Sequence, residues 1–179
     1  SAALREVFET EGITVLTGAR VTRVEPGADG GVVVVLDGAG DALRAERLLV
    51  ATGRRTDLAE VGLDSVGVDT SARAVPVDDR LRVAPGVWAV GDITGQGAFT
   101  HVSMYQAGIV IRDLLDEPGP AADYRALPRV TFTDPEIGAV GYTEEQARDA
   151  GLTVRTGTTA TASSSRGWIH GPGNEGVIK

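Results

Sequence analysis

The fold of this chain is decided by the stretch Val87-Trp88-Ala89-Val90-Gly91-Asp92, an apolar run that ends in a glycine and a carboxylate. Gly91 has no side chain to keep a ligand away from the backbone. Asp92 places a carboxylate at the C-terminal end of a predicted buried strand, the edge of open α/β sheets at which ligands bind. An ionised carboxylate only accepts hydrogen bonds, so it suits sugar or ribityl hydroxyls. Since Gly-Asp is also an ordinary turn, the pair alone leaves both interpretations open.

Composition limits the classes of function. The chain has 179 residues, of which 42% are hydrophobic, enough for the core of one or two domains. Its net charge of −8 argues against a general nucleic-acid surface. No run of 18 apolar residues and no secretory leader is present, so we expect no membrane partner and a cytoplasmic location. The chain has no cysteine and only two histidines, far apart, which argues against a metal site.

The first third of the sequence alternates short apolar runs with glycine-rich turns. We predict a helix over residues 4–11, ended by Gly12, and strands at residues 13–16, 19–25, 31–36, 42–43 and 47–53. The last run is largely apolar and ends at Gly53, as a buried strand does at a ligand edge. This order is typical of the back half of a nucleotide-binding domain.

The remaining sequence contains a second α/β segment and the start of a third unit. We predict a short strand at residues 81–83, the strand that ends at Gly91, a helix over residues 100–115 and a linker at residues 117–120. Strands at residues 129–133 and 137–142 follow, then a helix capped by Thr143 and ended by Gly151. A strand over residues 152–161 and a loop over residues 163–176 complete the prediction. The chain opens on Ser1 and closes on a strand that has barely begun, so we expect a fragment of a longer protein.

Three segments, in this order, resemble the pyridine nucleotide–disulfide oxidoreductase family, which includes dihydrolipoamide dehydrogenase, glutathione reductase and mercuric reductase. They are Ala51-Thr52-Gly53-Arg54-Arg55-Thr56, Trp88-Ala89-Val90-Gly91-Asp92 and the stretch from Phe132 to Glu144, which contains Asp134-Pro135-Glu136. The resemblance covers nearly the whole chain. It implies an α/β fold with partial Rossmann-like FAD- and NAD(P)-binding domains, followed by the start of an α+β dimerisation domain. The implied boundaries are 1–55 for the NAD(P) part, 56–124 for the FAD part and 125–179 for the dimerisation part.

The resemblance also implies two cofactors, FAD and NAD(P)H, and a set of residues that contact them. Gly91 and Asp92 would lie at the FAD ribityl chain, with Asp92 accepting hydrogen bonds from its hydroxyls. The segment that passes the flavin ring with its backbone N–H groups would be Ala98, Phe99, Thr100 and His101. Val21 and Gly53 would approach the nicotinamide nucleotide. The helix that starts near Thr100 would stabilise the anionic reduced flavin by about 1–2 kcal/mol through its positive N-terminus.

Other polar residues carry simpler interpretations. His101 is better explained as a helix-start residue with backbone contacts than as a catalytic base. Arg54 and Arg55 fit either a phosphate contact or a solvated, ion-paired surface. We assign no catalytic residue and no metal ligand within this chain. The family's glycine-rich cofactor loops and its redox-active cysteine pair are absent from these 179 residues, so we expect the fragment alone to be inactive.

The implied function is that of an oxidoreductase in which hydride passes from nicotinamide to flavin N5 and electrons continue to a disulfide or small-molecule acceptor. The full-length protein would be a homodimer without a nucleic-acid partner. One alternative is a natural non-catalytic module that self-associates through the segment after Leu127. A second is a flavoprotein that donates electrons to ferredoxin-like partners, which the segment from Asp134 to Glu144 disfavours.

Overall fold

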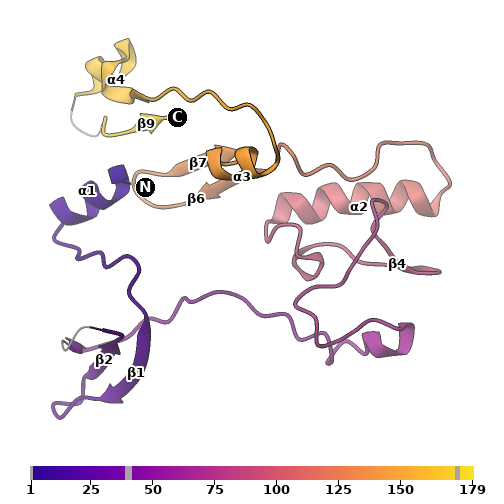
Figure 1. Ribbon diagram of the computed structural model, residues 1–179, viewed down its shortest axis with the longest axis horizontal. Helices are drawn as coiled ribbons and strands as arrows, with labels where there is room; N and C mark the ends of the chain where they lie inside the picture. The colour runs from indigo at the N-terminus through magenta and orange to yellow at the C-terminus, as the bar shows by residue number, and fades with distance from the viewer. Residues whose placement is uncertain (1, 39–41, 172–173) are drawn as a thin grey trace. The chain divides into compact units, whose positions relative to one another are not determined.

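The computed structural model describes residues 2–38, 42–171 and 174–179, and Figure 1 shows their elements in chain order. Contacts divide the chain into two compact units. One contains Ser1–Gly53 together with Gly157–Lys179, and the other contains Arg54–Thr156. The three predicted domain boundaries stay a prediction.

The first unit begins with a helix and a three-stranded antiparallel sheet. Helix α1 spans Ala2–Thr10, and the chain leaves it through Gly12 at φ +80°, a conformation that glycine adopts without strain. The strands are β1 (Val21–Pro26), β2 (Val32–Leu36) and β3 (Ala42–Ala45), in the order β1-β2-β3. The predicted helix and the predicted strands at residues 19–25, 31–36 and 42–43 are confirmed, because the turn glycines and the run of valines from Val32 to Val35 are local signals.

Two strand predictions in this unit are wrong. Residues 13–16 and 47–53 run as irregular chain, and Leu49 and Val50 expose 89% and 68% of their surface. A strand forms only when its backbone groups pair with a neighbour, and the described part of the chain offers residues 47–53 no such neighbour. The run is apolar in composition, but no residue in the described ranges pairs with it as a strand.

The C-terminal part of the first unit also departs from prediction. The predicted strand over residues 152–161 is reduced to β8 (Thr159–Ala160), which pairs antiparallel with β9 (Val177–Ile178). A 3₁₀ turn, η3 (Thr161–Ser163), ends at the start of the predicted loop over residues 163–176, and the loop contains a short helix, α4 (Ser165–His170). Residues 172 and 173 of this prediction lie outside the described residues. That helix forms because the hydroxyl of Ser164 accepts a hydrogen bond from the Gly167 backbone N–H, at 3.0 Å, and so caps its first turn.

The second unit is built around a small apolar core. Leu58, Val68 and Val75 are buried at its centre. The partly buried side chains packed against them come from the 3₁₀ turn η1 (Leu63–Val66), from the loop after it and from the segment over residues 83–93. They are Leu63, Val66, Ala72, Val77, Val83, Ala89 and Ile93. The core therefore lies beside the segment that leads to Gly91.

A hairpin and a long helix hold this segment in place. Strands β4 (Arg82–Ala84) and β5 (Val87–Trp88) pair antiparallel, and helix α2 (Thr100–Leu114) follows. Asp113 joins the hairpin to the helix, because its carboxylate accepts a bidentate pair of bonds from Arg82 and one bond from the Trp88 indole at 2.8 Å. These donors lower the pKa of Asp113. The predicted helix over residues 100–115 is thus confirmed, while the strand before Gly91 has only two paired residues.

The third predicted segment also lies in the second unit. Strands β6 (Pro128–Thr131) and β7 (Ile137–Val140) pair antiparallel, and helix α3 (Glu144–Asp149) follows, as Figure 1 shows. Thr143 and Gln146 form the capping box of α3, which confirms the predicted start of this helix. Within the described ranges, no helix has the length and apolar character needed to cross a membrane.

Candidate functional site

The candidate site begins where β5 ends. Gly91 follows at φ +84° and ψ −157°, a region of backbone space that is essentially restricted to glycine. A Cβ added there would meet the Cβ of Ser103 at 3.4 Å, so the helix α2 packs closely against this point. The chain then turns through the 3₁₀ helix η2 (Asp92–Thr94). The backbone conformation therefore requires the glycine, and Ser103 of α2 lies within contact distance of it.

Asp92 presents a half-exposed carboxylate directly after this glycine. Its side chain is 49% exposed, and Arg54 Nη1 donates to Asp92 Oδ2 at 2.8 Å. The same nitrogen also lies 3.4 Å from the carbonyl oxygen of Ala98. Because both charged groups are exposed to solvent, this ion pair contributes at most about 1 kcal/mol to stability. Of the two interpretations of Arg54, the structure shows the ion pair, with the predicted ligand-binding carboxylate as its partner.

The N-terminus of α2 lies next in the chain and is not capped by a side chain. Phe99 occupies the N-cap position in an extended conformation, and its carbonyl accepts from the N–H groups of Val102 and Ser103. Within the part of the chain that the structure describes, the backbone N–H groups of Thr100 and His101 meet no acceptor. These two donors, together with the partial positive charge of the helix end, favour an electron-rich ligand group.

His101 is engaged in structural contacts. Its Nε2 lies 3.0 Å from the carbonyl oxygen of Pro128, and its ring stacks on Phe99 with the ring centroids 5.3 Å apart. Because a carbonyl oxygen only accepts, Nε2 carries the proton in this contact. The contact ties the start of α2 to the start of β6. It agrees with the interpretation of His101 as a helix-start residue.

Behind these groups lies a buried side chain that the sequence analysis did not identify. Gln106 is completely buried. Its Oε1 accepts from the Gly91 backbone N–H at 2.5 Å, and its Nε2 donates to Thr94 Oγ1 at 3.1 Å and to Tyr124 Oη at 2.9 Å. Every polar hydrogen of the amide therefore has a partner, as a buried amide requires.

A signal for this residue was present in the sequence. Val102, Gln106 and Ile109 follow one another at helical spacing, and all three are buried in the structure. A glutamine within an otherwise apolar stripe must satisfy its amide inside the fold. The stripe could thus have predicted a buried polar contact, although the identity of its partners could not be read from spacing.

The two remaining predicted site residues belong to the first unit. Val21 is the first residue of β1 and pairs with Leu36, with 54% of its surface exposed. Gly53 has φ +123°, and a Cβ added there would meet no atom within 4 Å. Its backbone conformation favours glycine, while the space around it is open. Gly91, Asp92 and residues 98–101 thus lie on one short segment of the second unit, whereas Val21 and Gly53 belong to the first unit.

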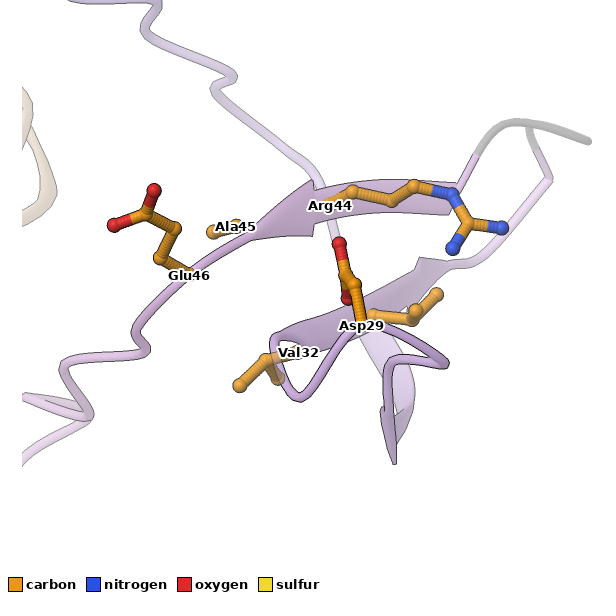
Figure 2. Close-up of a pocket in the computed structure, with 6 residues that line it drawn as sticks. Asp29, Val32, Arg44, Ala45 and Glu46 are labelled. Carbon is orange, nitrogen blue, oxygen red and sulfur yellow. The ribbon is translucent and has the colours of Figure 1, made fainter.

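A pocket of about 210 Å³ lies beside the β2–β3 pair, apart from every predicted site residue. Figure 2 shows side chains that line it, which come from the two strands, from the turn before β2 and from the residue after β3. The lining residues are Asp29, Val32, Val33, Arg44, Ala45 and Glu46. Among the described residues, no group of three or more histidine, aspartate or glutamate side chains is placed to hold a metal ion.

Comparisons with known proteins agree with this architecture. The family model described as pyridine nucleotide-disulphide oxidoreductase matches residues 1–107. The model for the dimerisation domain of the same family matches residues 127–179. These two matches, on a chain of mixed helices and strands, thus define an α/β class followed by the start of a dimerisation domain. The chain belongs to the pyridine nucleotide-disulphide oxidoreductase family, whose members are FAD-dependent.

Relatives and solved structures give the same result. A mercuric reductase of Streptomyces lividans is 38% identical over 95% of this chain and 36% of its own length. A dihydrolipoyl dehydrogenase of Geobacillus stearothermophilus is 32% identical over 93% of this chain and 36% of its own. The HOCl-induced flavoprotein disulfide reductase RclA of Escherichia coli superimposes with a TM-score of 0.81, at 31% identity, over 98% of this chain and 40% of its own.

The chain spans little more than a third of the length of these curated relatives. The predicted fold class is confirmed: α/β, with parts of Rossmann-like FAD- and NAD(P)-binding domains followed by the start of an α+β dimerisation domain.

Proposed function

We propose that this chain is part of an FAD-dependent, NAD(P)H-linked oxidoreductase and that it supplies one wall of the flavin site. The observation that carries the proposal is the position of Asp92, a half-exposed carboxylate that follows a strand end and lies beside the uncapped start of α2. The family match supports it, because members of this family are FAD-dependent.

The residues present fit a flavin. Asp92 supplies acceptor oxygens for the ribityl hydroxyls, and the free N–H groups of Thr100 and His101 supply donors for the carbonyl edge of the ring. Gly97 packs closely against Leu127: its φ is +146°, and a Cβ there would meet Leu127 Cδ2 at 3.1 Å. The acceptor, Asp92, and the donors, Thr100 and His101, therefore lie on one short stretch of chain. The acceptor would face the ribityl chain and the donors the ring.

When bound, FAD would take a hydride equivalent from NAD(P)H and pass electrons to a disulfide or small-molecule acceptor. The residues of this chain would bind and orient it. Asp92 would hold the ribityl chain, and the N-terminus of α2 would stabilise negative charge at the adjacent ring edge. Gly91, Ala98 and Phe99 would let the backbone approach, while Val21 and Gly53 would line the nicotinamide nucleotide. No proton-transfer role falls to a side chain of this segment.

The experiment is to express the complete reading frame that encodes this chain. We expect a yellow protein that releases FAD on denaturation and oxidises NADH or NADPH when an acceptor is added. A colourless protein that neither binds FAD nor oxidises either coenzyme would refute the proposal.

A self-association module is the alternative, and it is favoured by one observation. Large apolar side chains of the region that matches the dimerisation domain are exposed, with Phe132 at 84% and Trp168 at 80%. The same exposure is expected of an oxidoreductase that works as a homodimer, which we also propose. Flavin binding separates the two, because a module without FAD would dimerise and remain colourless.

A further inference from the structure

We propose that Gln106 is a positioning residue for the flavin-binding carboxylate, in that its buried amide locks Gly91 and thereby fixes the direction in which Asp92 is presented. This inference rests on the proposed function. Gln106 is completely buried, so it acts through the residues that it holds.

The hydrogen bonds around Gly91 form a closed ring with a defined direction. The Gly91 N–H donates to Gln106 Oε1, and Gln106 Nε2 donates to Thr94 Oγ1. The Thr94 hydroxyl then donates its proton to the Gly91 carbonyl oxygen at 2.8 Å. Its oxygen can therefore accept the bond from Gln106. Because a backbone N–H only donates, the amide has one orientation that satisfies the ring.

The ring restrains the backbone of Gly91. Glycine has the widest conformational freedom of any residue, and Gly91 holds a conformation that other residues rarely adopt. The ring fixes the peptide groups on both sides of Gly91, and the second of these groups leads directly to Asp92. Gln106 lies on α2, whose first residues carry the free N–H donors. One side chain therefore sets the carboxylate relative to these donors.

A second arm of the same amide reaches the segment after α2. Gln106 Nε2 donates to Tyr124 Oη, and the hydroxyl of the neighbouring Tyr105 accepts from the Asp123 N–H at 2.9 Å. This arm secures the segment that leads to β6 and does not touch Gly91. It can therefore be removed separately from the ring.

The experiment measures FAD binding to the apoprotein of the complete reading frame, with three near-isosteric variants. Q106L removes all three bonds of the amide, T94V breaks the ring at the hydroxyl, and Y124F removes the second arm only. Leaving a buried donor without its partner predicts a Kd for FAD about tenfold higher in Q106L and T94V. Y124F should raise it no more than about twofold, because this bond does not touch Gly91 and its loss acts on the stability of the fold.

The decisive measurement is the coupling to Asp92. If Gln106 acts by aiming this carboxylate, Q106L and T94V change the Kd by less than about twofold once D92A is present, because the target has been removed. A purely structural role would give the same fold-change with and without Asp92, and that result would overturn the proposal. T94V carries the test by itself should Q106L fail to fold.

Q146L is the matched control. The Gln146 side chain accepts from the Thr143 backbone N–H at 2.9 Å in the exposed capping box of α3, so its loss lowers the melting temperature and leaves the FAD affinity unchanged. A Kd that rises in Q146L as much as in Q106L would also overturn the inference. The proposed function fails separately: it is refuted if the unsubstituted protein does not bind FAD. If the protein binds FAD but D92A binds it as tightly, Asp92 does not contact the flavin, and the inference about Gln106 is overturned.

Discussion

Residues 47–53 and 87–92 follow the same pattern in the sequence, an apolar run that ends at a glycine, and the structure treats them in opposite ways. The second run continues β5 and ends at a glycine clamped by a fully buried amide. The first run is irregular chain with Leu49 almost fully exposed. The difference shows that an apolar run becomes an ordered strand end only when other residues of the fold pair with it and cover it.

The largest expected effect concerns the backbone of the exposed run. If residues 47–53 form a buried strand when the complete reading frame is present, the amide of Leu49 should exchange with solvent at least about a hundredfold more slowly there than in the 179-residue chain. Hydrogen exchange followed by mass spectrometry measures this ratio. Equal exchange in the two proteins would show that the run is irregular in both. The difference between the two apolar runs would then come from their own sequences and not from a missing partner.

The next effect concerns the ordered run. D92A should raise the Kd for FAD of the complete protein by about 10- to 100-fold, the range expected for losing a hydrogen bond to a charged acceptor. D92N retains one acceptor oxygen, so its Kd should lie between those of the unsubstituted protein and D92A. Titration of the apoprotein with FAD, followed by flavin fluorescence, gives all three constants. A D92A protein with unchanged affinity would remove Asp92 from the site.

A third prediction tests why the ordered run ends in glycine. G91A should lower the free energy of unfolding by about 2–3 kcal/mol, since it combines a glycine-only backbone conformation with a tight contact to Ser103. G151A is the control, because Gly151 also has a positive φ, +76°, but open space around it, and we expect about 1 kcal/mol there. Urea unfolding of both variants measures the difference. Equal losses would mean that the close packing of α2 on Gly91 costs nothing.

The smallest effect concerns the partner of Asp92. R54M removes the guanidinium that donates to this carboxylate, and we expect the Kd for FAD to change by less than about fivefold, because exposed ion pairs are weak. The change should shrink further at high salt, which screens exposed charges. FAD titrations at low and high ionic strength measure it. A loss as large as that of D92A would instead assign Arg54 a direct contact with the cofactor.

The sequence predicted the elements that depend on local signals. The turn before Gly31 fixed the β1–β2 hairpin, the spacing of Val102 and Ile109 predicted α2, and Thr143 marked the start of α3. The errors have two origins. The strands predicted at residues 13–16 and 47–53, and most of the one at residues 152–161, find no pairing partner in the described part of the chain. The Ser164 cap of α4 is a local signal that was missed within a glycine-rich segment.

The site divides in the same way. One part of the site could be derived from residues close together in the sequence. This part is the glycine and the carboxylate that follow an apolar run, together with the helix that begins at Thr100. The pairing of Arg54 with Asp92 spans 38 residues, and the ring through Gln106 spans 15. The sequence alone determined the family and the local elements, because turn chemistry and helical periodicity act over a few residues. Only the tertiary structure decided which side chains hold the carboxylate, because burial and hydrogen-bond partners depend on residues that folding brings together.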